Sequence, residues 1–304
     1  MKLKIPFLVV LIVLSLFQSV CAVGALQNNE QTKINLDSGS KIIYVDNNGT
    51  DKNDGLTPNK PKRNLEKAIA IANDGDTVQL APGTYFGGNA NIDKDITLSG
   101  TNQNNTILTG QSQRGIYIAC GKTVTITNIT VKHSATGIWN SGTLHLKNST
   151  LQNNNAFAYI GPFGHHWIRG GGIFSDGTLD LCGVTIKENN AKEQGGGIYS
   201  SVGDLTVINS TITSNSAGEG AGIYQRGHEF TIVNSTISNN YAKSCAGGIR
   251  TSKNGYILNS TLSGNQANEG GGIFNEGALT IIDSIISNNI VKLGVGLYST
   301  EKVP

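Results

Sequence analysis

The chain has 304 residues, and 14% of them are charged, against roughly 25% in an average soluble protein. Its 23 basic and 21 acidic residues give a formal net charge of +2. Loss of Lys2 and Lys4 with a signal peptide would leave 23 − 2 = 21 basic residues and no net charge. This balance excludes the strong positive field that is typical of proteins that bind nucleic acid or anionic membranes.

The first residues predict secretion. Lys2 and Lys4 precede an apolar run over 5–17, and the small-residue segment SVCAVGA follows it. This order is typical of a signal peptide, and the run is too short to span a membrane. We predict cleavage after Ala22, with Ala25 as the alternative, a mature chain without a membrane span, and a secreted or cell-surface location.

The residues after the signal peptide predict a capped domain. KIIYVD (41–46) alternates as a strand does, and 64–72 has the pattern of a short amphipathic helix with Asn64 as its N-cap. We predict a signal peptide over 1–22 and a flexible segment over 23–40. One domain follows over 41–304, with an N-terminal cap over 41–75 and a series of coils over 76–304.

A repeat dominates the rest of the chain. Eight apolar residues follow a glycine-rich step at spacings of 22, 35, 25, 25, 26, 24 and 24 residues: Ile116, Ile138, Ile173, Ile198, Ile223, Ile249, Ile273 and Leu297. Apolar residues alternate with period two inside each unit, which predicts three short strands per unit and disfavours helix.

Units of this kind bury their apolar faces by stacking. Each strand then pairs in parallel with its equivalent in the next coil, about 4.8 Å away, and the inward residues form one continuous core. We therefore predict an all-β fold, a right-handed parallel β-helix of about ten coils.

Two columns of asparagine recur at the predicted turns. The first has acceptor triplets for N-glycosylation and comprises Asn128, Asn148, Asn209, Asn234 and Asn259; the second comprises Asn154, Asn189, Asn215, Asn240, Asn265 and Asn289. Equivalent amides on neighbouring coils can hydrogen-bond along the stack. We interpret the first column as an inward, structural ladder rather than as a set of sugar sites, and Asn48 and Asn104 as better acceptors.

Two segments carry a resemblance to known families. YVDNNGTDKNDGLTPNKP and AIAIANDGDTVQLAPGTY resemble the opening of the pectate-lyase-like parallel β-helix proteins. Units such as ISNNYA and LSGNQA resemble the repeats of polymorphic outer membrane proteins, although those repeats typically carry Phe where this chain has Ile or Leu. Together the resemblances cover about 41–298 and imply the fold, but this fold hosts lyases, hydrolases, adhesins and passive surface proteins.

The acidic residues do not predict an active site. A lyase of this fold is expected to cluster carboxylates for calcium beside a basic residue, whereas the carboxylates of this chain are scattered. Glu219 and Glu269 share a turn column with Cys245 between them, about 10 Å apart. That spacing alone would suit an inverting hydrolase, but we interpret both as solvated turn residues and predict no catalytic residue, metal site or cofactor.

The residue after each repeated apolar position predicts an outward stripe. Seven of the eight are aromatic: Tyr117, Trp139, Phe174, Tyr199, Tyr224, Arg250, Phe274 and Tyr298. Stacking between coils would explain the stripe, and so would a platform for sugar rings. The long interval adds an aromatic insertion over 153–172. The predicted ligand face combines the two: Trp139, Phe174, Tyr199 and Tyr224 with Tyr159, His165, His166 and Trp167.

These features favour a non-catalytic binding or adhesin-type protein whose partner is a polysaccharide or a surface protein. The alternative is a polysaccharide lyase or glycoside hydrolase, and a third reading is a remnant without independent function. The sequence shows no cap after Leu297, so association through the C-terminal end is also expected.

Overall fold

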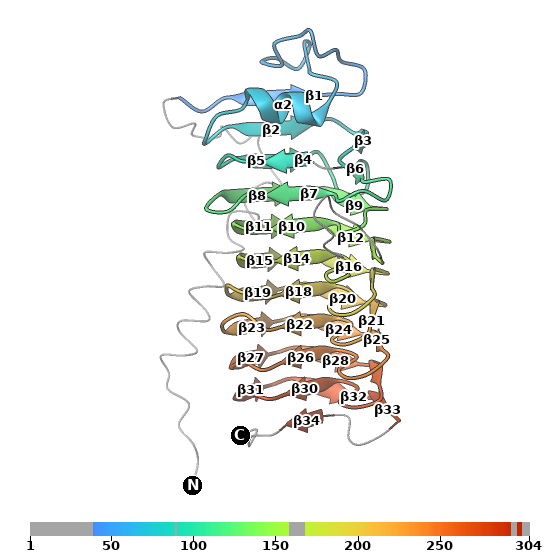
Figure 1. Ribbon diagram of the computed structural model, residues 1–304. Coiled ribbons are helices and arrows are strands. Elements are labelled where there is room, and N and C mark those ends of the chain that lie inside the picture. Colours follow the sequence, from blue (N-terminus) through green and yellow to red (C-terminus); the bar gives the residue numbers. More distant parts are fainter. Residues whose placement is uncertain (1–38, 89, 158–167, 293–296, 300–304) are drawn as a thin grey trace.

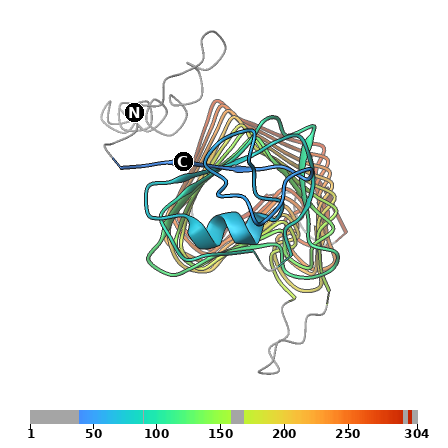
Figure 2. The same ribbon diagram turned by 90° about the horizontal axis from the view of Figure 1, so that it is seen from above.

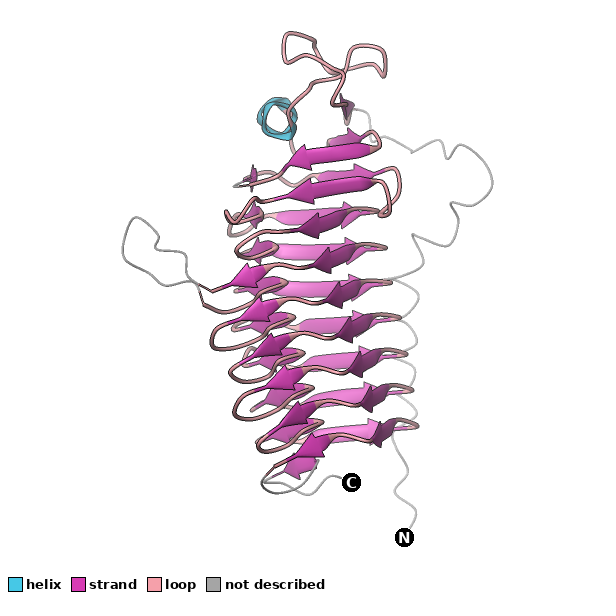
Figure 3. Ribbon diagram, turned by 90° about the vertical axis from the view of Figure 1, so that its right-hand side faces the viewer, coloured by secondary structure: helices cyan, strands magenta, loops and turns pink. Residues whose placement is uncertain are grey.

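The computed structural model describes residues 39–88, 90–157, 168–292 and 297–299, the last of these by backbone only. The chain winds into a rod of stacked coils (Figure 1), and its strands lie in flat layers, one above the other (Figure 3). The predicted signal peptide lies outside the described residues. No helix in the described part of the chain is long and apolar enough to cross a membrane.

The strands of the described residues form four parallel sheets, here A to D. Sheet A contains β1 (Ile42–Val45), β2 (Thr77–Leu80), β5 (Thr97–Gly100), β8 (Thr123–Thr127), β11 (Thr143–Lys147), β15 (Thr178–Cys182), β19 (Leu205–Ile208), β23 (Phe230–Val233), β27 (Gly255–Leu258) and β31 (Leu279–Ile282). Sheet B contains β3 (Gly83–Phe86), β6 (Thr106–Thr109), β9 (Thr130–Lys132), β12 (Thr150–Gln152), β16 (Thr185–Lys187), β20 (Thr211–Thr213), β24 (Thr236–Ser238), β28 (Thr261–Ser263) and β32 (Ile285–Ser287).

Sheet C carries the repeated apolar positions. It contains β4 (Ala90–Ile92), β7 (Ile116–Ile118), β10 (Ile138–Asn140), β14 (Ile173–Ser175), β18 (Ile198–Ser200), β22 (Ile223–Gln225), β26 (Ile249–Thr251), β30 (Ile273–Asn275) and β34 (Leu297–Ser299). Its repeated isoleucines have no exposed surface and line one core that runs through the stack. The ten strands of sheet A and the parallel registers confirm the predicted right-handed parallel β-helix of about ten coils.

The six repeats that begin between Ile138 and Ile273 have four strands each, so the prediction of three was wrong for them, whereas the repeat that begins at Ile116 has three. Sheet D is made of two-residue strands: β13 (Asn155–Ala156), β17 (Asn190–Ala191), β21 (Ser216–Ala217), β25 (Tyr241–Ala242), β29 (Gln266–Ala267) and β33 (Ile290–Val291). The second position is a buried alanine in five of the six strands. Two residues are too few to show the alternation by which strands are recognised in sequence.

The glycine-rich steps lie where the chain passes from sheet D to sheet C. A Cβ atom on Gly197 would lie 2.6 Å from the carbonyl oxygen of Gly222 in the next coil, and Gly172 is placed in the same way against Gly197. Only glycine therefore allows the coils to approach one another here.

The N-terminal end of the rod has the cap that the sequence predicts. Helix α2 (Leu65–Ile71) lies across the coil when it is viewed from above (Figure 2) and buries Leu65, Ala68 and Ile69. Asn64 is the N-cap residue, but its side chain donates to Asp51 instead of closing the helix. The Asp51 carboxylate accepts the backbone N–H groups of Arg63 and Asn64.

This arrangement shifts the titration of Asp51. Burial alone would raise the pKa of this carboxyl group, but the hydrogen bonds from Asn64 and Arg63 outweigh burial and hold the pKa below its usual value. Asp51 thus serves as a hydrogen-bond acceptor of the cap.

An amide ladder is present, but the second asparagine column forms it, not the first column for which it was predicted. Asn240 is fully buried, and its Oδ1 accepts the backbone N–H and the Nδ2 of Asn215 at 2.9 and 3.0 Å. Its Nδ2 donates to Asn265 Oδ1 and to the Ile212 carbonyl. The same side-chain bonds join successive members from Asn154 to Asn289.

The first asparagine column is not inward, which corrects the predicted ladder of Asn128, Asn148, Asn209, Asn234 and Asn259. Asn128 is half-buried and the other four are exposed. All five have positive φ, between 43° and 59°, because the chain turns there from sheet A into sheet B. In this left-handed conformation asparagine is tolerated better than most residues, so the turn explains the column.

The inward residue of each Asn-Ser-Thr triplet is the serine. Ser235 is buried, accepts the Ser210 N–H at 3.1 Å and donates to the Val233 carbonyl at 2.8 Å. Ser210 and Ser260 make equivalent bonds. The triplet therefore recurs because it encodes a left-handed turn, a buried hydroxyl and the first residue of a sheet B strand.

Candidate ligand-binding groove

The predicted stripe is a real column on the outer face of sheet C. Pairing between neighbouring strands aligns Tyr117, Trp139, Phe174, Tyr199, Tyr224, Arg250, Phe274 and Tyr298. The ring centroids of Trp139 and Phe174 lie 4.3 Å apart, those of Phe174 and Tyr199 5.2 Å, and those of Tyr199 and Tyr224 5.4 Å. Phe174, Tyr199 and Tyr224 therefore stack from coil to coil, and the Trp139 ring lies tilted by 37° against Phe174.

Arginines complete this stack. The Arg114 guanidinium lies 4.6 Å from the Tyr117 ring, and that of Arg169 lies 5.4 Å from the Tyr199 ring. Arg250 fills the one non-aromatic position, 5.6 Å from the Tyr224 ring and 4.9 Å from the next ring of the stripe. A guanidinium over an aromatic face continues the attraction that rings provide elsewhere in the column.

Stacking leaves little of the rings exposed. Trp139 and Tyr199 keep 7% and 2% of their surface, and Phe174 and Tyr224 are half-buried. Ligand contact by these four remains a prediction, and the burial of Trp139 and Tyr199 favours support of the surface over direct contact. The other members of the predicted ligand face, Tyr159, His165, His166 and Trp167, lie outside the described residues.

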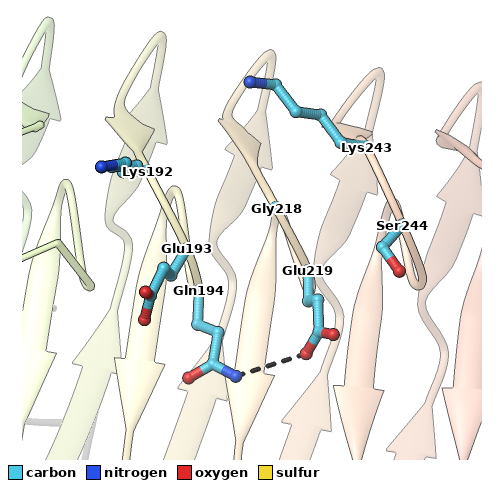
Figure 4. Close-up of a pocket in the computed structure, with 7 residues that line it drawn as sticks. All are labelled: Lys192, Glu193, Gln194, Gly218, Glu219, Lys243 and Ser244. Atoms are coloured by element: carbon cyan, nitrogen blue, oxygen red, sulfur yellow. Dashed lines mark hydrogen bonds between the residues drawn. The ribbon is translucent and has the colours of Figure 1, made fainter.

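A shallow groove lies beside the stripe, at the turns that join sheets D and C. It has a volume of about 340 Å³ and spans three successive coils (Figure 4); it is lined by Lys192, Glu193, Gln194, Gly218, Glu219, Lys243 and Ser244. Two of these side chains are cationic and two are anionic, so the lining charges cancel.

The groove exists because one turn is shorter than its neighbours. Gln194, Glu219 and Cys245 occupy equivalent positions in three coils. Glu219 follows the inward alanine Ala217 by two residues, whereas in the flanking coils the corresponding interval is three. The middle coil presents Gly218, which has no side chain, between Lys192 and Lys243, and the surface is recessed there.

A network of polar contacts fixes the Glu219 carboxylate at this surface. Gln194 Nε2 donates to it at 3.3 Å (Figure 4), and Arg250 Nε lies 3.7 Å from it. Arg250 also pairs with Glu276 at 3.6 Å, and its Nη1 lies 2.7 Å from Cys245 Sγ. The stacking of Arg250 holds its guanidinium in place, so the acceptor oxygens of Glu219 are held in a fixed position.

Cys245 is the buried neighbour of this network. Burial raises the pKa of its thiol, and the nearby Arg250 guanidinium opposes that shift without cancelling it. The column order Glu219, Cys245, Glu269 agrees with the order inferred from the sequence. Within the described residues, no group of three His, Cys, Asp or Glu side chains could hold a metal ion.

Most of the groove was not predicted from the sequence. Glu219 was interpreted as a turn residue, and no role was predicted for Lys192, Gln194, Lys243 or Ser244. The signal that could have found them is the change in turn length around Gly218, which becomes visible only when the coils are aligned on the alanine of sheet D.

Among the comparisons with known proteins, only the one with solved structures found matches. No family model and no curated protein matches the sequence, so the resemblance to polymorphic outer membrane protein repeats remains a prediction. Pectate lyase Pel9A is similar over 86% of this chain and 79% of its own, with 13% identity and a TM-score of 0.44. A pectin methylesterase from carrot is similar over 88% of this chain and 90% of its own, with 11% identity and a TM-score of 0.41.

Proposed function

We propose that this protein is a secreted or cell-surface binding protein without catalytic activity, and that it holds an extended glycan in the groove around Gly218. The observation that carries the proposal is the groove itself, in which lysine, carboxylate and amide groups line a recess beside a rigid aromatic column. A few converging polar groups on a firm apolar support are typical of ligand sites.

The arrangement of the acidic groups supports binding over catalysis. Glycoside hydrolysis requires two carboxyl groups that face each other across the bond to be broken. Glu219 and Glu269 lie in one column with Cys245 between them, and Glu219 is engaged by Gln194 and Arg250. A lyase or hydrolase stays an alternative that no specific observation favours.

A second contact surface is compatible with the proposal. β32 and β33 lie at the edges of sheets B and D among the described strands, and Ile285 and Ile290 expose 59% and 54% of their surface. Apolar side chains at a sheet edge are suited to pairing with another chain. Association through this end is therefore a second prediction, separate from the glycan site.

Binding should be tested with the secreted chain on a broad glycan array, followed by affinity measurement for any glycan that is retained. Replacing Lys192 and Lys243 together by Ala removes two exposed donors from the groove. We expect this to weaken binding about tenfold, or about 1.4 kcal/mol.

The matched control is Lys253→Ala, an exposed lysine at the turn between sheets C and A, which should leave the affinity unchanged. A wild-type chain that retains no glycan would overturn the proposed function. Equal losses in the double variant and in the control would move the site away from the groove.

A further inference from the structure

The groove carries information about the charge of its ligand. Glu219 and Glu193 keep 31% and 46% of their side-chain surface exposed, so both carboxylates remain accessible. Carboxylate oxygens accept hydrogen bonds only, and such bonds to hydroxyl groups are stronger than those between neutral partners. A ligand rich in hydroxyl groups therefore suits this side of the groove.

The arginines nearest the groove are not placed to bind an anionic ligand. Arg169 Nη2 lies 3.4 Å from Glu193, and Arg250 is shared between Glu219 and Glu276. Two-pronged recognition of a ligand carboxylate needs a guanidinium whose donors are directed at it. Here guanidinium donors are directed at the protein's own carboxylates, at the Tyr199 hydroxyl and at the Cys245 sulfur.

The two lysines cancel the negative charge of the two carboxylates but do not make the groove positively charged. Their ammonium groups lie on one side of the groove, and the carboxylates of Glu193 and Glu219 lie on the other (Figure 4). A polymer with a carboxylate on every unit would meet both sides along its length. It would gain attraction from the lysines on one side and lose a similar amount to the carboxylates on the other.

The length of the groove fits a repeating ligand that follows the rod. Lining residues come from three successive coils, which span about 10 Å along the stack at about 4.8 Å per coil. That is about the length of a disaccharide in an extended chain.

We infer that the groove selects a neutral, hydroxyl-rich polysaccharide over a polyuronate, with Glu219 as the central hydrogen-bond acceptor and Arg250 as the residue that positions it. This inference rests on the proposed glycan-binding function and adds the class of ligand to it.

The test compares two kinds of polymer on the whole secreted chain. Affinities are measured for soluble β-glucan and mannan, which are neutral, and for polygalacturonate and alginate, which are polyuronates. We expect a neutral polymer to bind at least tenfold more tightly than either polyuronate. The preference should persist at high salt, because it depends on short hydrogen bonds rather than on long-range attraction.

Two variants assign this preference to the groove. Glu219→Gln and Glu193→Gln keep the shape of each side chain and remove its charge, and each should weaken neutral-polymer binding and reduce the preference over polyuronate severalfold. Glu229→Gln, at an exposed turn between sheets C and A, is the matched control and should change neither. Circular dichroism establishes that each variant is folded, and Glu193 is the safer position because it is more exposed.

The outcomes separate this inference from the function beneath it. Tighter binding of a polyuronate would overturn the inference and leave the binding function standing. A preference that is unchanged in both glutamine variants would overturn the role of Glu219. A chain that binds neither kind of polymer, nor any other glycan on the array, would overturn both proposals.

Discussion

Two columns of asparagine run along this rod, and they differ in almost every physical respect. In the inner column, Asn240 is buried and its side chain makes four hydrogen bonds to neighbouring coils. In the outer column, Asn234 is exposed and has a φ of 48°. The inner residue is there for its amide, and the outer one for its backbone. The same repeated letter in a sequence can thus report either a side-chain contact or a dihedral angle.

The largest effect is expected from breaking the inner column. Replacing Asn240 by Ala removes the acceptor of the Asn215 N–H, one of the two acceptors of Asn215 Nδ2 and a donor to the Ile212 carbonyl. Each buried group that is left unpaired costs about 1–3 kcal/mol, so we expect a loss of about 3 kcal/mol in the free energy of unfolding. Urea denaturation checks this, and a variant as stable as the wild type would show that the ladder is dispensable.

A smaller effect is expected at the buried serine of the triplet. Ser235→Ala removes one acceptor, and the Ser210 N–H loses its partner in the interior. We expect a loss of about 1–2 kcal/mol. Ser235→Cys keeps a weak acceptor of similar size, so its free energy of unfolding should lie between those of the wild type and Ser235→Ala in the same denaturation experiment. A Cys variant less stable than the Ala variant would contradict the hydrogen-bond account.

The smallest effect is expected in the outer column. Asn234→Gly should change the free energy of unfolding by no more than about 0.5 kcal/mol, because glycine adopts positive φ without strain. Asn234→Ala should cost about 1 kcal/mol, since alanine keeps the Cβ that opposes this conformation and loses the short polar side chain by which asparagine tolerates it. If the glycine variant were as damaging as Asn240→Ala, the outer side chain would have a role that its exposure does not indicate.

The fold could be predicted because the repeat specifies it many times over. The apolar positions of Ile198 and Ile223 are in register with one another, as their sequence spacing predicts. Helix α2 was predicted equally well, since its buried residues recur at helical spacing. Sheet D was missed because Ala217 and its equivalents form strands too short to have a period.

The orientation of the asparagines could have been predicted from exceptions. Gly183 and Asp283 replace asparagine in the outer column, and both have positive φ. Glycine cannot join an amide ladder but suits a left-handed turn. The inner column is asparagine in every coil from Asn154 to Asn289. The groove could not be predicted in this way, because a recess depends on how three turns of unequal length lie together in space.

The inner column also gives the rod an electrical direction. Every link of the ladder runs the same way, from the Nδ2 of one asparagine to the Oδ1 of the next along the chain, beginning at Asn154 and ending at Asn289. Amide dipoles aligned in one sense add, as the peptide dipoles of a helix do, and each bond polarises the next. The core of this solenoid therefore carries a macrodipole along its axis, with its positive pole toward the C-terminal coils, although the side chains that create it are all uncharged.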